Sequence, residues 1–245
     1  MAVAGWSGEE VRVVSVELAF DPPERASDLL ALATHALDVI GLDLSDEGQA
    51  RLRLDLTGSP LSDQYMQAGT CYTGARVQGT VRLSAEGQPD LHASVAGEVP
   101  TRTLIRFCQK DPAGAPFEEA FEIGLSGAMA ELFGPSSVPY LTDVVATHRS
   151  GSHNVLLSIM GAAIDAYRTM ERADVPTRSQ YEFLDAAIWT IPMVMGAPDD
   201  ASRSYVSTLR GLLLDHSETD FGFNDEDDVD AWRKWLTEWG AERGL

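Results

Sequence analysis

The chain has few basic side chains for its length. Its 245 residues include 18 lysines and arginines against 38 aspartates and glutamates, which gives a net charge of −20 at pH 7. A protein that holds nucleic acid or an anionic membrane surface needs clustered cations to neutralise phosphates. The charge balance therefore argues against both partners. It is typical either of a solvated acidic surface or of a surface that attracts a basic protein.

Long hydrophobic runs are also missing, although hydrophobic residues make up 44% of the chain and can supply a packed core. No segment approaches the roughly 18 apolar residues that a membrane-spanning helix requires. The first residues, MAVAGWSGEE, lack the basic and apolar regions of a secretory signal peptide. We therefore expect a cytoplasmic protein or, alternatively, an exported form whose leader has been removed.

Cysteine is scarce, and its placement argues against a zinc site. Cys71 and Cys108 stand far apart in the sequence, with no CxxC pair and no flanking histidines. Both fall in strand-like segments. We favour two reduced thiols in a core, with a disulfide in an oxidising compartment as the alternative.

Motifs for catalysis are absent as well. GLSGA at 124–128 offers Gly124 and Ser126, but it has Ala128 where a nucleophile elbow needs glycine, and it lies within a helical pattern. TGARVQG at 73–79 lacks both the GK[ST] and the GxGxxG signatures of phosphate-binding loops. We therefore predict no cofactor and do not expect an enzyme, unless separated residues assemble a site that no motif marks.

Metal ligands are equally sparse. Among the five histidines, only His148 and His153 are close in sequence, and the glycine-containing loop between them does not place both on one helical face. Together with Asp143 they are the candidates for a metal site. A polar loop between two helices explains the same residues, and we predict no metal.

What the first half of the chain does contain is an alternation of strand and helix patterns. VRVVSVELAF is valine-rich and alternating, which predicts a strand, and apolar spacing after it predicts a helix. LIRF at 104–107 is either a last strand or an irregular segment that leads back toward the next helix. The predicted strands are 11–20, 50–58, 70–85 and 90–100, and the predicted helices are 23–40 and the segment ending at Gly134. This order indicates an α+β domain over 1–134, with an antiparallel sheet and packed helices.

From residue 135 onward the sequence predicts helices alone. Their apolar spacing and short polar turns indicate an antiparallel helical array over 135–245. The predicted helices are 138–147, 154–170, 180–196, 201–215 and 228–243.

The segment VPYLTDVVATHRSGSHNVLLSIMGAAIDAY resembles a HEAT-type helical repeat, and 177–215 resembles a second, degenerate unit. The ending DFGFNDEDDVDAWRKWLTEWG is similar to the close of bacterial HEAT-repeat proteins, where an Asp-Phe-Gly turn leads into a tryptophan-bearing cap helix. The resemblance covers 138–240 and implies a binding or scaffold role rather than chemistry. Two units are fewer than the three or so that normally bury a continuous core. Residues 1–134 resemble no family that we recognise.

Two stretches are candidates for partner binding. The first, SPLSDQYMQAGTCY, carries Tyr65, Met66 and Tyr72 between predicted strands, where they either contact a partner or cover the sheet edge.

The second candidate is the acidic stretch from Glu218 to Asp230, which holds seven acids and no base. It does not fit a calcium loop, because Gly222 and Asp225 stand where the EF-hand pattern requires a ligand and a glycine. We name Asp225, Asp227 and Asp228 as candidate contacts with a basic partner. Capping of the last helix, whose Trp232, Trp235, Leu236 and Trp239 form one apolar stripe, explains the same acids.

These observations predict a non-enzymatic binding or scaffold protein that contacts other proteins. One alternative is an acidic inhibitor or immunity-type protein that masks a basic partner. A second is an enzyme with a site not visible as a motif. Self-association through the concave face or an exposed sheet edge is compatible with each of these functions.

Overall fold

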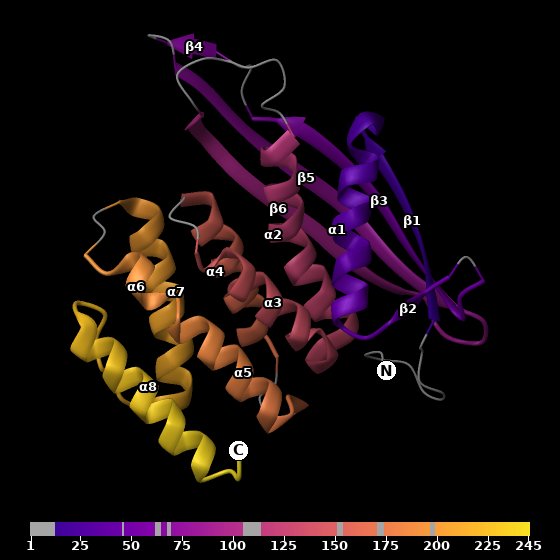
Figure 1. Ribbon diagram of the computed structural model, residues 1–245. Helices are drawn as coiled ribbons and strands as arrows, with labels where there is room; N and C mark the ends of the chain where they lie inside the picture. The colour runs from indigo at the N-terminus through magenta and orange to yellow at the C-terminus, as the bar shows by residue number, and fades with distance from the viewer. Residues whose placement is uncertain are drawn as a thin grey trace. The chain divides into compact units, whose positions relative to one another are not determined.

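The computed structural model describes residues 13–45, 47–61, 65–67, 70–104, 114–150, 154–170, 174–196 and 199–245. The chain divides into two compact units, Met1–Gly134 and Pro135–Leu245 (Figure 1). In the part of the chain that is described, no helix is both long enough and apolar enough to cross a membrane. Mixed α and β structure is present, as the sequence predicts.

In its described residues, the first unit contains a six-stranded sheet and two long helices. Its elements are β1 (Val13–Asp21), η1 (Pro23–Arg25), α1 (Ala26–Val39), β2 (Asp43–Leu44), β3 (Ala50–Pro60), β4 (Tyr65–Gln67), β5 (Thr70–Ala85), β6 (Leu91–Leu104) and α2 (Gly114–Phe133).

The sheet is mixed, so the prediction of an antiparallel sheet is wrong for its first strands. β1 lies parallel to both β2 and β3, whereas β3, β5 and β6 run antiparallel to one another in succession. The reason is the crossover: α1 follows β1 and carries the chain back to the end of the sheet where β1 began. β3 therefore starts beside Val14, which pairs with Ala50.

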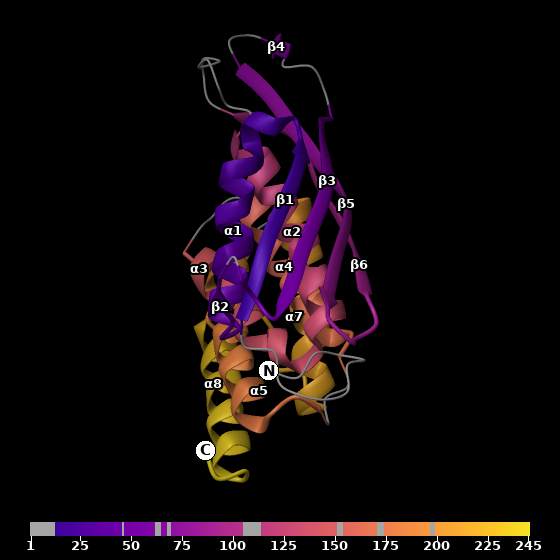
Figure 2. The ribbon, with the colours of Figure 1, turned by 90° about the vertical axis from the view of Figure 1, so that its right-hand side faces the viewer.

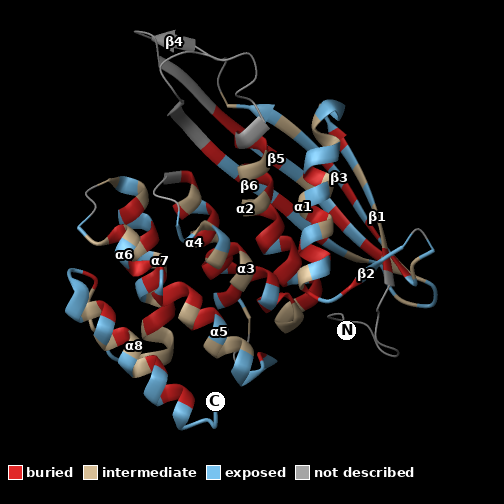
Figure 3. Ribbon diagram, in the orientation of Figure 1, coloured by how far each residue is buried: buried red, intermediate tan, exposed pale blue. Residues whose placement is uncertain are grey.

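One face of this sheet is covered by helices and the other is open. Along β3, Leu52, Leu54 and Leu56 are buried while the residues between them are exposed (Figure 3). α1 and α2 pack on the buried face (Figure 2). A glycine allows α2 to approach closely, because a Cβ atom on Gly97 of β6 would lie 1.7 Å from the carbonyl oxygen of Ala120.

The second unit is entirely helical in its described residues. Its elements are α3 (Val138–His148), α4 (Asn154–Arg168), α5 (Thr177–Ile188), α6 (Ile191–Val194), α7 (Asp200–Ser217) and α8 (Glu226–Ala241), and η2 (Gly134–Ser137) leads into α3. The single helix predicted over 180–196 is instead two, α5 and α6. Pro192 in the first turn of α6 has no backbone N–H for Ile188, so the helix is interrupted at Trp189 and Thr190.

Contacts between the helices of this unit arrange them in two rows. α5 contacts both α3 and α8, and α4 contacts α7. α3 packs against α4, which joins the rows. Apolar side chains fill the interior: the Tyr167 and Phe183 rings, from α4 and α5, stack with their centroids 4.1 Å apart. The buried Thr190 is satisfied, since its Oγ1 donates to the Ala187 carbonyl and accepts from the Tyr205 hydroxyl, each at 2.6 Å.

Candidate binding surface

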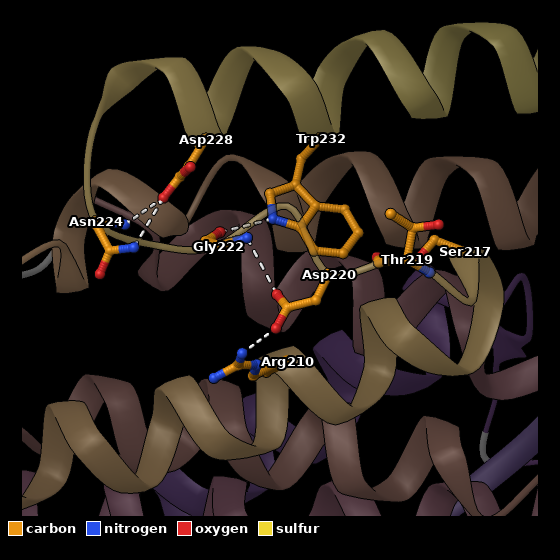
Figure 4. A network of polar contacts seen from close by, with 8 residues as sticks. All are labelled: Arg210, Ser217, Thr219, Asp220, Gly222, Asn224, Asp228 and Trp232. Atoms are coloured by element: carbon orange, nitrogen blue, oxygen red, sulfur yellow. Dashed lines mark hydrogen bonds and ion pairs between the residues drawn. The ribbon is translucent and has the colours of Figure 1, made fainter.

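The Asp-Phe-Gly turn before α8 holds that helix in place (Figure 4). Asp220 accepts a hydrogen bond from the Gly222 amide at 3.1 Å and forms an ion pair with Arg210 of α7. The Gly222 carbonyl accepts from the Trp232 indole N–H at 2.8 Å. The Phe221 ring meets the Trp232 ring edge-on, with centroids 4.8 Å apart. The turn therefore ties Trp232 to α7.

Two of the three candidate acids are hydrogen-bonded within their own chain. Asp225 caps α8 by accepting from the Asp228 amide at 3.1 Å. Asp228 accepts from the Asn224 amide at 2.7 Å and from its side-chain nitrogen at 3.2 Å. Asp227 is exposed in the first helical turn, and none of the hydrogen bonds or ion pairs in the described segments involves its carboxylate. Partner binding by these acids stays a prediction, and capping accounts for two of them.

The tryptophan stripe of α8 packs inward. Trp232, Leu236 and Trp239 are buried, and Trp235 is half-buried. The Arg243 guanidinium lies over the Trp239 ring, 4.2 Å from its centroid. These side chains form part of the core and leave little aromatic surface on α8 for a partner.

The other predicted residues can be placed only in part. The backbones of Tyr65 and Met66 in β4 pair with Tyr72 and Cys71 at the start of β5. The side chains of these four residues lie outside the described part of the chain, as does all of Cys108.

The metal candidates are likewise incompletely placed. His148 ends α3 and is half-buried, whereas His153 lies outside the described residues. Within the described segments, no group of histidine, cysteine and acidic side chains has the geometry to hold a metal ion. Ser126 of the GLSGA segment is buried inside α2, and its hydroxyl donates to the Glu122 carbonyl at 3.0 Å. It is a helix residue, not a nucleophile elbow.

The structure instead draws attention to Trp189, which no motif marks. Its side chain, directly after α5, is 48% exposed, the largest exposed fraction of any large hydrophobic residue that is described. Arg233 of α8 lies over the ring, with Cζ 4.3 Å from its centroid. Arg149, directly after α3, lies 5.8 Å from the same centroid. Residues from three helices of one row therefore form an exposed aromatic platform with two guanidinium groups.

Asp185 supports this platform from one turn earlier on α5. It is half-buried and accepts a hydrogen bond from the Trp189 side chain. Burial raises the pKa of Asp185 above its ordinary value, although Arg149, Arg233 and the indole hydrogen bond oppose that shift. Arg149 and Arg233 both lie close enough to Asp185 to lower its pKa, and Arg233 also pairs with Asp230 at 3.5 Å, so two guanidinium groups and two carboxylates meet at this site.

The sequence alone does not predict this site, because its members lie far apart in the chain. One local signal exists: the buried stripe of α5 includes Phe183, Ala187 and Ile188, and Trp189 falls one turn after Asp185 at the edge of that stripe. The contribution of Arg149 and Arg233 follows only from helix packing.

Comparisons with known proteins assign no family. No family model matches the chain, and no curated protein matches it. Among solved structures, a variant PelC dodecamer from Paraburkholderia phytofirmans matches 49% of this chain and 90% of its own, with 14% sequence identity and a TM-score of 0.25. A similarity of this size assigns neither the fold nor the function of the chain.

Proposed function

We propose that this chain is a non-enzymatic binding protein and that the surface of Trp189, Arg149 and Arg233 is where it contacts a protein partner. The observation that carries the proposal is the exposure of a tryptophan held between two arginines. Tryptophan and arginine are among the residues most enriched at the energetic centres of protein interfaces. Asp185 and the packed row of α3, α5 and α8 hold them in place before binding, which lowers the entropic cost of association.

The charges of the site indicate the chemistry of the partner. No carboxylate of the described part of the chain lies within ion-pair distance of Arg149, whereas Arg168, Arg178, Arg203 and Arg210 each have one. Arg233 has an exposed ion pair with Asp230 at 3.5 Å, but its buried Nε–H has no acceptor among the described atoms. A partner segment with a carboxylate beside an apolar or planar group would pair with Arg149 and cover the indole of Trp189.

The HEAT-like interpretation of the helical unit belongs to the same proposal. Two observations support it: α5 contacts α3 before it and α8 after it, and α4 contacts α7, as two-row stacks of helical hairpins do. The Asp-Phe-Gly turn and the buried Trp232 behave as a terminal cap. A scaffold of this kind presents one row of helices to its partner, and Trp189 lies on the row of α3, α5 and α8.

The acidic inhibitor is the second candidate, favoured by the net charge of −20 and by the exposed Asp227. The two hypotheses predict opposite partners, because the Trp189 site suits an acidic segment and the inhibitor suits a basic one. Under either hypothesis we propose a cytoplasmic location, with an exported form whose leader has been removed as the alternative.

Affinity capture from the source cell tests the proposal with three variants. Trp189→Ala and Arg149→Ala remove the platform, and Arg178→Ala is the matched control because Arg178 is an exposed arginine on the neighbouring α5 that pairs with Glu182. A partner recognised here is retained by the wild type and by Arg178→Ala. Its recovery falls about 30-fold in Trp189→Ala, the effect of losing about 2 kcal/mol at a hot spot. Equal recovery by all four proteins, with unchanged circular dichroism, rejects the site.

A further inference from the structure

The edge of β6 offers a second surface, independent of Trp189. β6 pairs with β5 along one side, from Leu91 opposite Leu83 to Val99 opposite Ala75. In the described part of the chain, no strand pairs with its other side. We propose that this edge pairs antiparallel with the same edge of a second copy of the chain, centred on Val95.

The first nine residues of β6, 91–99, lack the features that normally prevent such pairing, whereas Pro100 and a register shift follow directly after them. Natural edge strands carry lysine, proline or a bulge, which block the approach of another strand. The segment 91–99 reads LHASVAGEV and contains neither lysine nor proline. Its ladder with β5 is regular, and the register shift opposite Thr73 and Ala75 comes only after Val99. Nine residues of open edge are long for a surface that stays solvated.

The sequence of the edge is complementary to itself in one register. Centring the pair on Val95 sets His92 opposite the partner's Glu98, and sets Glu98 opposite the partner's His92. Both residues are exposed on the open face of the sheet. The imidazole N–H can donate to Glu98, of which one oxygen, Oε2, is held by Arg76 at 2.6 Å. Centring on residue 94 or 96 instead removes both of these cross-strand pairs.

The residues on the helix-covered face of β6 also match one another in this register. There Leu91 falls opposite the partner's Val99, and Val95 falls opposite the partner's Val95. Val95 and Val99 are buried against the helix-covered face in each copy, and Leu91 is half-buried. Two sheets joined in this way would keep apolar residues on one face and polar residues on the other.

The oligomeric state of the full chain tests the proposal by light scattering over a range of concentrations. The wild type should reach twice the 26.5 kDa mass of one chain. The double variant Ser94→Lys, Ala96→Lys should remain monomeric, because in the proposed register each lysine faces a lysine of the second copy. The control Gln78→Lys lies directly opposite Ala96 but one strand inside the edge, and it should dimerise as the wild type does. A monomeric wild type, or a lysine variant that still dimerises, overturns the proposal.

A charge exchange tests the register itself. His92→Glu should weaken the dimer at least 10-fold, and the exchanged pair His92→Glu, Glu98→His should restore it. Failure of the exchanged pair to recover would overturn the register centred on Val95.

A cysteine pair gives a positive result even if the lysine variant fails to fold. With Cys71 and Cys108 replaced by serine, Ser94→Cys with Ala96→Cys should cross-link two chains under mild oxidation, while Gln78→Cys should not. Equal cross-linking by the edge cysteine pair and by Gln78→Cys would show that β6 does not form the dimer interface. Trp189→Ala should leave the dimer unchanged, so the partner-binding proposal and this one succeed or fail separately.

Discussion

Replacing Gly222 with alanine tests whether the Asp-Phe-Gly turn stabilises the terminal helix. Gly222 has a φ of 89°, in the left-handed region that favours glycine. A Cβ atom there would lie 2.5 Å from Oδ2 of Asp228, the oxygen that accepts both hydrogen bonds from Asn224. The substitution therefore strains the backbone and displaces a carboxylate at the beginning of α8.

The two effects can be estimated separately. An alanine in the left-handed region costs about 1–2 kcal/mol. Displacing Asp228 sacrifices its bonds to Asn224, and because this carboxylate is partly exposed the loss is about 0.5–1.5 kcal/mol. We therefore expect Gly222→Ala to lower the free energy of unfolding by about 1.5–3.5 kcal/mol.

Urea unfolding followed by tryptophan fluorescence measures this loss, since Trp232, Trp235 and Trp239 all lie on α8. Gly196→Ala is the matched control: Gly196 has a φ of 68°, and no atom lies within 4 Å of the position that its Cβ would take. It should show the backbone cost alone. In an Asp228→Ala background the cost of Gly222→Ala should fall to that of the control. Equal losses at Gly222 and Gly196, with no coupling to Asp228, would refute the role assigned to this turn.

Two further predictions concern the close approach of α2 and the cap of α7. Gly97→Ala should destabilise the first unit by about 3 kcal/mol, at the upper end for overpacking, because its Cβ would meet the Ala120 carbonyl. Thermal melts measure both this variant and its control Gly127→Ala, which lies on α2 with open space around it and should stabilise the unit by up to about 1 kcal/mol. A Gly97→Ala variant as stable as the wild type would contradict the close packing of α2 on β6. Asp199 caps α7 by accepting from the Ser202 amide at 2.9 Å and from its hydroxyl at 2.7 Å, which lowers the pKa of Asp199. A carboxylate with a lowered pKa stabilises the fold above the ordinary carboxyl range, and this stabilisation is lost as the pH falls through the folded-state pKa. Asp199→Asn should therefore be less stable than the wild type in urea titrations at about pH 7, and this difference in unfolding free energy should disappear by about pH 3. A difference that stays constant between these pH values would contradict the prediction.

Most elements can be predicted from local pattern. The alternation of Leu52, Leu54 and Leu56 places β3 half-buried, and the observed burial follows it residue by residue. The 70–85 segment is one strand, β5, as predicted, and its ladder with β6 shifts register at Gly74. The break between α5 and α6 is not predicted, although Pro192 gives a local reason for it.

The binding site cannot be predicted in the same way. Asp225 and Asp228 lie in one acidic run and attract attention through charge density, yet the helix end accounts for them. Trp189 falls within a predicted helix, but its exposure depends on which neighbours cover it. A residue's solvent exposure is a property of packing, and periodicity alone indicates only which face of a helix points inward.

The sequence by itself determined most local features of this protein: the long strands and helices, the apolar faces of those elements and the capped start of α8. These depend on side-chain spacing and on backbone groups within a few residues, so a single sequence contains them. Tertiary structure alone decided that β1 and β3 are parallel, and that Arg149 and Arg233 meet at Trp189. Both depend on contacts between segments tens of residues apart, where many pairings satisfy the same hydrophobic pattern and packing selects one of them.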